Sequence, residues 1–329
     1  MTMLIAVGLV TALFLVGMLG AAAGLQWVFG VALPYLAVGM FVIGLAARVL
    51  RWANVPVPFR IPTTCGQQRS LAWIRPQRLE NPPDTPSVIG RMALEILGFR
   101  SLLRNTKTVM IDGRRLTYAT DLALWAGAIV MHWAMLIALI RHLRLMTNPV
   151  PGFVTLVERF DGFFEVGMPV IYLTSVAFLG ALAYLLYRRL AIPEVRYISL
   201  VGDYFPLFLL LAIGGSGFWL RHVTTTDIAS VKALVLGLTH FAPTVPASIS
   251  PLFFGHLFLV SVLLAYFPFS KLLHMPGVFL SPTRNLANTT RISRHVNPWD
   301  YPVKVHTYAE YEDELRDKMI GAGLPVEKD

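Results

Sequence analysis

The chain opens with an uncharged stretch, residues 1–47, which reads MTMLIAVGLVTALFLVGMLGAAAGLQWVFGVALPYLAVGMFVIGLAA, and its first charged residue is Arg48. A helix needs roughly 20 apolar residues to cross a bilayer, so this stretch is long enough for two crossings. No basic residues precede it, so a cleaved signal peptide is not expected. With Trp27 at the membrane interface, the pattern predicts a helical hairpin with spans at 3–23 and 28–48.

Composition places the whole chain among membrane proteins. Of its 329 residues, 55% are hydrophobic and only 14% are charged, and the mean hydropathy is +0.60. Soluble domains draw roughly a quarter of their residues from the charged types. We therefore predict an all-α fold, a polytopic membrane helical bundle with six transmembrane helices, of which the last four lie at 122–142, 166–187, 204–222 and 252–273.

The basic residues are distributed unevenly between the two sides of this bundle. Of 28 Lys and Arg residues, 23 lie in segments that share a side with the termini and 5 lie on the other side. Cytoplasmic loops carry the excess of Lys and Arg, so both termini are expected in the cytoplasm, with the chain in a bacterial or archaeal inner membrane. The excess of Lys and Arg on the cytoplasmic side accounts for the net charge of +9. No basic stripe interleaved with aromatic residues is present, so nucleic acid is excluded as a partner.

The apolar runs divide the chain into four parts. An N-terminal transmembrane hairpin (1–48) precedes a cytoplasmic segment that is rich in proline and arginine (49–120). A four-helix domain follows (121–274), and a cytoplasmic, extramembrane C-terminal arm comes last (275–329). The arm has no apolar run long enough to cross a bilayer.

The 49–120 segment contains a stretch with helical periodicity between Ser87 and Arg104. Apolar residues recur there at helical spacing, and the charged residues fall between them. This pattern predicts an amphipathic helix that lies on the cytoplasmic membrane surface or docks on a soluble partner, with its charged face in water. A solvated helix with no partner is the alternative. The apolar positions are Ile89, Met92, Ala93, Ile96, Leu97 and Leu103, and the charged ones are Arg91, Glu95, Arg100 and Arg104.

A single cysteine, Cys65, limits the cofactors that this chain can hold. It excludes an internal disulfide, a four-cysteine zinc site, and an iron–sulfur cluster built by this chain alone. Covalent c-type haem attachment is also excluded, because no Cys-x-x-Cys-His sequence exists. We expect Cys65 to pack at a subunit contact.

Four histidines lie within or at the ends of predicted spans, where ionisable side chains are rare and usually functional. His132 and His142 belong to the third span, and His256 and His274 belong to the sixth. At about 1.5 Å per residue, the two spacings cover about 15 Å and about 27 Å. The second spacing makes five turns, so His256 and His274 are expected on one face of one helix, whereas His142 lies about 80° from His132.

The third and sixth spans run in opposite directions, so the four histidines form two pairs at different depths. His142 is level with His256 toward the outer face, and His132 is level with His274 toward the cytoplasm. One imidazole from each of two helices is what a six-coordinate haem iron requires in a helical bundle. We predict two haems as cofactors, with a vertical offset of roughly 6 Å within each histidine pair.

These residues resemble a known family, the respiratory nitrate reductase gamma subunit, which is a dihaem membrane cytochrome b. The resemblance rests on the His-x9-His and His-x17-His spacings and on the stretch FPFSKLLH at 267–274. The N-terminal hairpin and three further stretches look like one branch of that family, the cytochrome b subunits of the DsrMKJOP membrane complexes that accompany dissimilatory sulfite reductase. The three stretches are IPTTCGQQ (61–68), IGRMALE (89–95) and FRSL (99–102).

The resemblance implies that His132 and His274 are the iron ligands of a cytoplasmic-side b-type haem, and His142 and His256 those of an outer-side one. It implies a quinone-linked oxidoreductase that works as an electron-transfer subunit in dissimilatory sulfur metabolism. Menaquinone or ubiquinone would exchange near the outer haem. Electrons would pass to a cytoplasmic iron–sulfur subunit that is DsrK-like and similar to heterodisulfide reductase, with the other subunits of the complex and, indirectly, the small sulfur carrier DsrC as partners.

Polar residues at the outer ends of the third and fifth spans are candidates for a quinone site. Arg141, Arg221 and His222 can each donate a hydrogen bond to a quinone carbonyl. Both arginines can instead reach lipid headgroups, and His222 can be an interfacial side chain.

Two other functions stay open from the sequence. A proton-coupled transporter would use the intramembrane histidines as a proton path and would bind no haem. A passive anchor for a cytoplasmic enzyme would not need the four histidines. The sequence does not encode the direction of electron flow.

Overall fold

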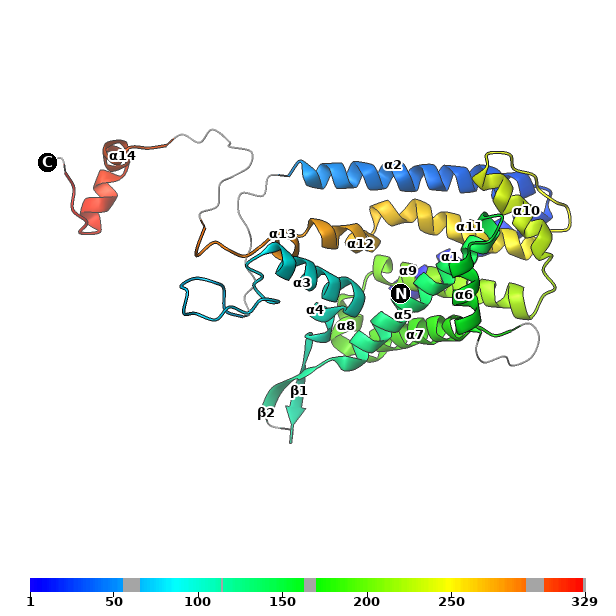
Figure 1. Ribbon diagram of the computed structural model, residues 1–329, viewed down its shortest axis with the longest axis horizontal. Helices are drawn as coiled ribbons and strands as arrows, with labels where there is room; N and C mark the ends of the chain where they lie inside the picture. The colour runs from blue at the N-terminus through cyan, green and yellow to red at the C-terminus, as the bar shows by residue number, and fades with distance from the viewer. Residues whose placement is uncertain (56–65, 114, 163–169, 294–304, 328–329) are drawn as a thin grey trace.

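The structure is a computed structural model that describes residues 1–55, 66–113, 115–162, 170–293 and 305–327. Among these residues, six helices are long and apolar enough to cross a membrane, which confirms the predicted number and indicates an integral membrane protein. They form one bundle (Figure 1). The spans are α1 (Thr2–Ala22), π-helical η1 (Val28–Ala32) continuing into α2 (Leu33–Ala53), α5 (Leu122–Met146), α7 (Leu173–Ala191), α9 (Val201–His222), and α11 (Pro251–Tyr266) continuing into the 3-10 turn η2 (Phe267–Phe269).

Shorter elements lie at the two ends of the bundle. We define the loop end as the end that carries 66–121, 192–200 and the chain after Leu272, and the far end as the opposite one. The far end holds α6 (Gly152–Asp161) and α10 (Ile228–Thr239). Figure 1 shows α14 (Tyr308–Gly321), in the C-terminal arm, standing apart from the bundle. The loop end holds α3 (Thr85–Gly98), α4 (Arg100–Leu103), β1 (Thr106–Ile111), β2 (Arg115–Thr120), α8 (Pro193–Ile198), η3 (Lys271–Leu273), α12 (His274–Gly277), η4 (Val278–Leu280) and α13 (Pro282–Asn285).

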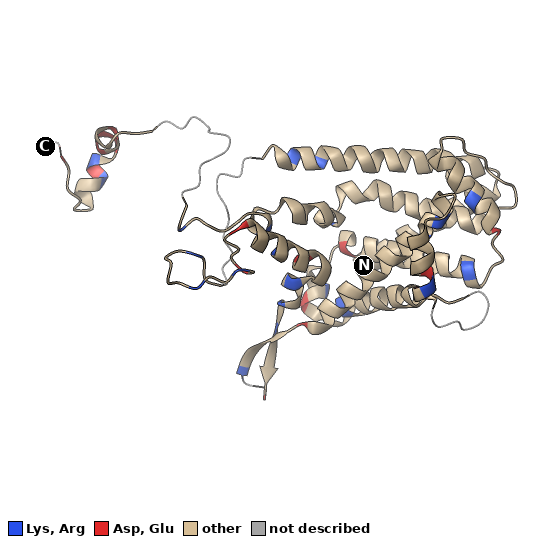
Figure 2. Cartoon of the chain, in the orientation of Figure 1, with Lys and Arg blue, Asp and Glu red and all other residues tan. Residues whose placement is uncertain are grey.

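The bundle is organised around α11, which packs against α1, α2 and α9, while α7 packs against α5 and α9. Small residues allow the closest approach, because Gly17 of α1 faces Gly255 and Phe258 of α11 with no room for a side chain. Leu209 and Leu259 are fully buried where these helices meet. Figure 2 shows that charged side chains gather at the ends of the bundle and outside it, as a lipid-exposed surface requires.

The last span ends earlier than its apolar run indicated. The α-helix stops at Tyr266, because Pro268 has no backbone N–H and Ser270 adopts an extended conformation in which its side chain caps Leu272. His256 and His274 are therefore not on one continuous helix, and the expected five-turn alignment is wrong. The fourth span begins at Leu173, and the first four residues of its predicted range, 166–169, lie outside the described residues.

The loop end contains one β-hairpin that the sequence analysis missed, outside the membrane spans. Strands β1 and β2 pair antiparallel from Thr106 opposite Thr120 to Ile111 opposite Arg115. Three residues, 112–114, separate the paired Ile111 and Arg115, and Asp112 and Gly113 both have positive φ, a conformation that Gly and Asp tolerate better than most residues. The signal was present in the sequence as Asp-Gly between two β-branched stretches.

The predicted amphipathic helix is present as α3, but its charged face is buried instead of wet. Arg91 and Glu95 are only 4% and 9% exposed. Arg91 donates to the Glu80 carbonyl at 2.9 Å, and Glu95 accepts from the Ser101 backbone N–H at 3.0 Å. The expectation of a solvated charged face was wrong because the surrounding loop supplies hydrogen-bond partners for both charges.

The chain after the last span returns to this loop. The Asn288 backbone N–H donates to the Pro82 carbonyl at 2.7 Å, and its side-chain amide donates to Asn81 Oδ1 at 3.0 Å. Gln68 donates to the Thr290 hydroxyl at 2.9 Å. Residues more than 200 positions apart are thus joined in one polar layer at the loop end.

The contact between Gly17 and α11 gives a test of the packing. We expect Gly17→Leu to destabilise the bundle by about 1–3 kcal/mol, because a side chain there must displace Phe258 or the Gly255 backbone. Thermal unfolding in detergent measures the loss. Gly8→Leu is the control, since nothing lies within 4 Å of a side chain at that position of the same helix. Equal stability of the two variants would contradict the packing.

Candidate functional site

His132 and His274 come together at the loop end of the bundle. Their ring centres are 6.0 Å apart and their planes are inclined at 80°. His132 projects from α5, and His274 is the first residue of α12, immediately after the 3-10 turn η3. The break after α11 therefore does not separate the predicted pair. The ring of Phe99 lies edge-on to His132, with 5.0 Å between the ring centres.

Three of the four candidate ligands share one hydrogen-bond arrangement. The Nδ1 atoms of His132, His142 and His274 lie 2.7–2.9 Å from backbone carbonyl oxygens three or four residues earlier, which belong to Ala128, Ala138 and Lys271. A carbonyl oxygen only accepts, so each Nδ1 carries the proton and donates it. The Nε2 atom is then left with a free lone pair, which is the form that binds a metal.

His256 reaches the same state through a different helix. Its Nδ1 lies 2.9 Å from the hydroxyl of Ser216 on α9, and that hydroxyl donates to the Ala212 carbonyl at 2.6 Å. Because the single hydroxyl hydrogen is used there, Ser216 accepts the Nδ1–H of His256. Gly217 makes the approach possible, since a side chain on it would lie 3.2 Å from the His256 ring.

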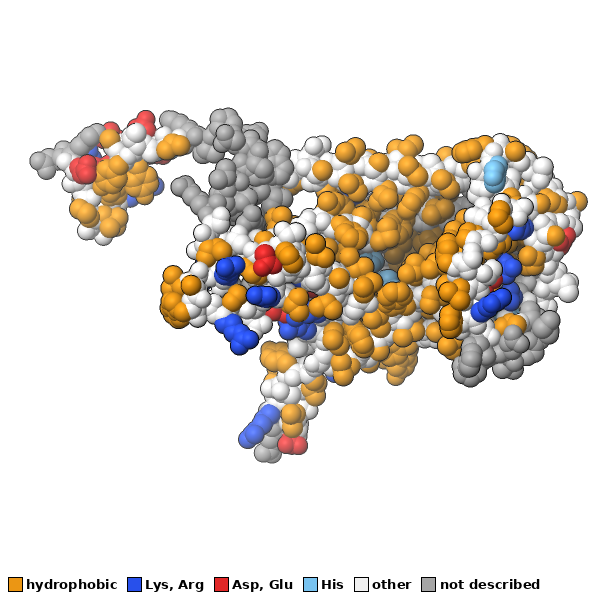
Figure 3. Space-filling model, in the orientation of Figure 1, with side chains coloured by type: hydrophobic (Ala, Val, Ile, Leu, Met, Phe, Trp, Pro, Cys, Tyr) orange, Lys and Arg blue, Asp and Glu red, His pale blue; other side chains and the backbone are white. Residues whose placement is uncertain are grey.

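The second predicted pair lies nearer the far end. His142 projects from α5, and His256 projects from α11 and is joined to α9 through Ser216. Figure 3 shows histidine side chains at the floor of a hollow in an otherwise apolar face of the bundle. The structure thus brings His132 and His274 together, and the pairing of His142 with His256 stays a prediction.

The far end of α5 holds a buried ionic cluster beside His142. Arg141 is 9% exposed, its Nε lies 2.9 Å from Asp161 Oδ2 on α6, and its guanidinium stacks 3.8 Å above the Tyr172 ring centre. It also donates to the Thr174 and Ser175 hydroxyls at 3.2 Å. The structure places this candidate quinone-site residue within a network that already uses most of its donors.

The other two candidate quinone-site residues are less constrained. Arg221 also stacks on the Tyr172 ring, 4.4 Å from its centre, and donates to the Val170 carbonyl at 3.3 Å. His222 ends α9, with its ring centre 4.4 Å from that of Phe218. Among the described residues, no hydrogen bond, ion pair or ring contact joins His222 to the four candidate ligands. Cys65 lies outside the described residues.

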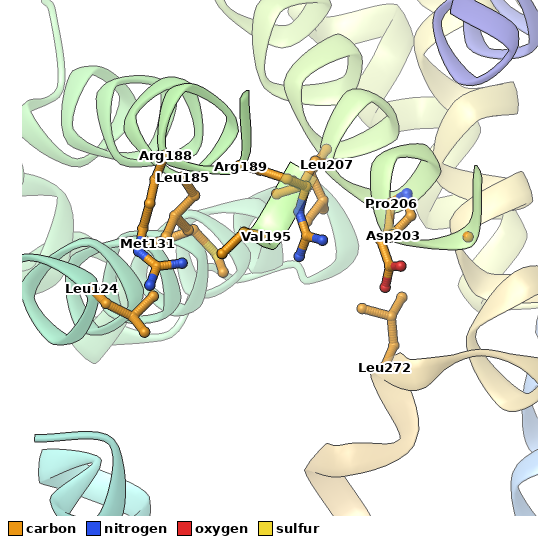
Figure 4. Close-up of a pocket in the computed structure, with 12 residues that line it drawn as sticks. Leu124, Met131, Leu185, Arg188, Arg189, Val195, Asp203, Pro206, Leu207 and Leu272 are labelled. Carbon is orange, nitrogen blue, oxygen red and sulfur yellow. The ribbon is translucent and has the colours of Figure 1, made fainter. Parts of the chain in front are cut away.

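A groove of about 240 Å³ opens at the loop end between α5, α7 and α9. Figure 4 shows Arg188, Arg189 and Asp203 among its lining residues, with the Asp203 carboxylate pointing toward Leu272. Lys271, the neighbour of Leu272, pairs with Asp203 at 2.6 Å, and Arg188 pairs with Asp121 at 2.8 Å. These ion pairs hold α9 to the segment before His274 and α7 to the start of α5.

Sequence reasoning missed two residues that touch the candidate ligands. Ser216 stands in the run Gly214-Gly215-Ser216-Gly217, where small residues in a span indicate close helix approach, and that signal was available. Phe99 was noted only as part of a similar stretch. Its contact with His132 depends on how the 66–104 loop folds back, which no local pattern encodes.

The region that contains these histidines is similar to known proteins. Residues 116–295, which include all four histidines, match the family profile described as nitrate reductase gamma subunit. A protein of Archaeoglobus fulgidus named Hdr-like menaquinol oxidoreductase cytochrome b-like subunit is 44% identical over 280 residues, covering 83% of each chain. A protein of the same name from Archaeoglobus profundus is 39% identical over 276 residues, covering 82% of each chain.

The Arg141–Asp161 pair provides a stability test of the far end. Asp161→Asn should cost about 3 kcal/mol, because it leaves the buried Arg141 charge without its counterion. Glu158→Gln, on the same helix, should cost less than about 1 kcal/mol, because its partner Arg144 is half exposed. Thermal unfolding of both variants checks the difference, and equal losses would show that the buried pair is not structural.

Proposed function

The chain belongs to the nitrate reductase gamma subunit family, and from this we propose that it is a membrane cytochrome b subunit that moves electrons between quinone and a cytoplasmic redox partner. We propose two b-type haems, one ligated by His132 and His274 and the other by His142 and His256. The single observation that carries the proposal is the hydrogen-bond arrangement that the four rings share, in which Nδ1 is bonded and Nε2 is left free.

The separation of one pair supports the haem assignment. Two metal–imidazole bonds of about 2 Å each place the ligating nitrogens about 4 Å apart and the ring centres about 6 Å apart. The ring centres of His132 and His274 are 6.0 Å apart, so these residues fit an iron between them with little movement. Haem supplies the one-electron redox chemistry when it is bound.

The chain's own residues tune and isolate that chemistry. The backbone carbonyls of Ala128, Ala138 and Lys271, and the hydroxyl of Ser216, hold the imidazole rings in one tautomer and raise their basicity as ligands. The apolar bundle excludes water around them, which strengthens the electrostatic control of each site.

We place quinone exchange at the far end, beside His142 and His256. Arg221 and His222 are the residues with donors available for a quinone carbonyl, while Arg141 orients Tyr172 through its stacked guanidinium. The relatives are named menaquinol oxidoreductase subunits, which favours menaquinone over ubiquinone. Quinone protons would exchange on this side of the membrane.

The loop end is proposed to face the cytoplasm, with both termini on that side of an inner membrane. The excess of Lys and Arg at this end supports that orientation. The likeness to DsrM, the cytochrome b subunit of the DsrMKJOP complex, suggests a DsrK-like iron–sulfur subunit as electron partner, DsrC indirectly, and a role in dissimilatory sulfur metabolism. The term Hdr-like in the relatives' names is consistent with a partner similar to heterodisulfide reductase.

Haem stoichiometry with redox spectroscopy tests the proposal. Purified protein should show b-type absorbance with near two haems per chain, and alanine at any one of the four histidines should remove the haem of its pair. His240→Ala should keep both haems, because His240 caps α10 and its Nδ1 bonds within that helix. A colourless, folded protein would favour the proton-coupled transporter, and haems that survive all four substitutions would refute the ligand assignment.

The Ser216 hydrogen bond gives a sharper prediction for one haem. Ser216→Ala removes the acceptor for His256 Nδ1–H, so the ligand becomes less basic and the midpoint potential of that haem should rise. A rise on the order of 20–60 mV corresponds to a hydrogen bond of about 0.5–1.5 kcal/mol.

Two variants control the redox titration. Ser216→Thr keeps the hydroxyl and should restore the potential. Ser261→Ala removes a buried hydroxyl that bonds the Leu257 carbonyl on α11 and should leave both potentials unchanged. An equal shift in Ser216→Ala and Ser261→Ala would mean that helix packing, and not the imidazole bond, sets the potential.

A further inference from the structure

The exposed face of α3 contains only apolar residues beyond its first turn. Ile89, Leu94, Ile96 and Leu97 are 64%, 42%, 37% and 56% exposed. The only charged residues of α3, Arg91 and Glu95, are buried on the opposite face. A helix bathed in water carries its polar residues outward, so this face is built for an apolar medium.

Residues 100–105 connect the turn at Phe99 to the start of α5, so they indicate how deep in the membrane this turn lies. Six residues after Phe99, the Asn105 carbonyl accepts from the Asp121 N–H at the start of α5, at 2.9 Å. Most of that stretch is the short helix α4. Measured along the axis of α5, Phe99 therefore lies up to about 9 Å from Asp121. Phe99 lies toward the bundle, because its ring contacts His132, which is eleven residues beyond Asp121.

The length of α5 places this contact within the hydrocarbon layer. A helix of 25 residues is about 37 Å long and exceeds the roughly 30 Å hydrocarbon thickness by about 7 Å. His132 lies about 16 Å beyond Asp121, so it is inside the hydrocarbon however that surplus is divided between the two ends. The end of α3 therefore reaches membrane depth beside α5.

The C-terminal end of α3 has the hydrogen bonds that a helix end within the hydrocarbon layer requires. The last carbonyls of a helix lack partners within it, and hydrocarbon offers no water to satisfy them. The Trp133 indole donates to the Leu97 carbonyl at 3.1 Å, and the Trp125 indole donates to the Gly98 carbonyl at 2.8 Å. Two indoles of α5 thus cap α3, and Phe99 turns the chain with a left-handed φ of 50°.

We infer that the C-terminal part of α3 is embedded among the acyl chains of the leaflet at the loop end, where Phe99 shields the His132 side of the bundle from that leaflet. Its partner is lipid, and not a soluble protein. The C-terminal end of α3 enters the membrane beside α5, and the chain returns to the membrane surface through α4. The segment therefore does not cross even one leaflet completely. This inference does not depend on haem or quinone.

Spin-label accessibility in phospholipid vesicles tests the inference. Cys65→Ser removes the only cysteine, and nitroxides are then attached at Ile96→Cys in the full chain. Oxygen concentrates among acyl chains, whereas a nickel chelate stays in water. We expect the Ile96 label to be more accessible to oxygen than to nickel, matching a label at Ile43→Cys on α2, which is 73% exposed.

Tyr118→Cys on strand β2 is the matched aqueous control, because Tyr118 is 72% exposed and lies on the extramembrane hairpin. Its label should favour nickel. An Ile96 label that behaves like the Tyr118 label would overturn the inference and place α3 in water. An Ile96 label that neither reagent reaches would also overturn it, because a protein surface would then cover the helix.

A second measurement tests the indole caps. Trp125→Phe combined with Trp133→Phe leaves the Leu97 and Gly98 carbonyls without donors, so the end of α3 should withdraw toward water and the Ile96 label should lose oxygen accessibility and gain nickel accessibility. Trp27→Phe, which removes an exposed indole at the far end, should leave the label unchanged. No shift in the double variant would contradict the capping role.

Discussion

The Nδ1–H of each imidazole in the membrane bundle needs an acceptor within the protein, because hydrocarbon provides none. In this protein the acceptor is a carbonyl of the same helical segment for His132, His142 and His274, and the Ser216 hydroxyl for His256. The hydrogen bond that satisfies Nδ1 also leaves the lone pair of Nε2 free. The absence of water among the acyl chains thereby fixes the tautomer of all four imidazoles.

The same constraint explains the loop end. Arg91 and Glu95 turn inward to partners in the 66–104 loop, and the terminal carbonyls of α3 accept from two indoles of α5. Only apolar side chains remain on the outer face of the helix. The β-hairpin that follows stays in the aqueous layer, where its unpaired strand edges can be solvated.

Charged residues are arranged differently at the two ends of the bundle. At the far end, Arg141 is buried with Asp161 and stacked on Tyr172, so one cluster fixes α5, α6 and the start of α7 beside His142. At the loop end, Lys271–Asp203 and Arg188–Asp121 join helix termini around an open groove. The first arrangement is closed and rigid, which suits a site that excludes water. The second leaves charged side chains partly accessible beside Leu272.

The sequence by itself determined the number of spans and which histidines lie in the third and sixth apolar runs, because apolar length and residue spacing are local properties. It also contained the Asp-Gly hairpin signal and the glycine run around Ser216, which were readable but not used. Only the tertiary structure decided that His274 follows a 3-10 break, that the charged face of α3 turns inward, and that Phe99 meets His132. Each of these features depends on hydrogen bonds or ring contacts from segments that are distant in the chain. Residue periodicity does not indicate which distant groups will lie nearby.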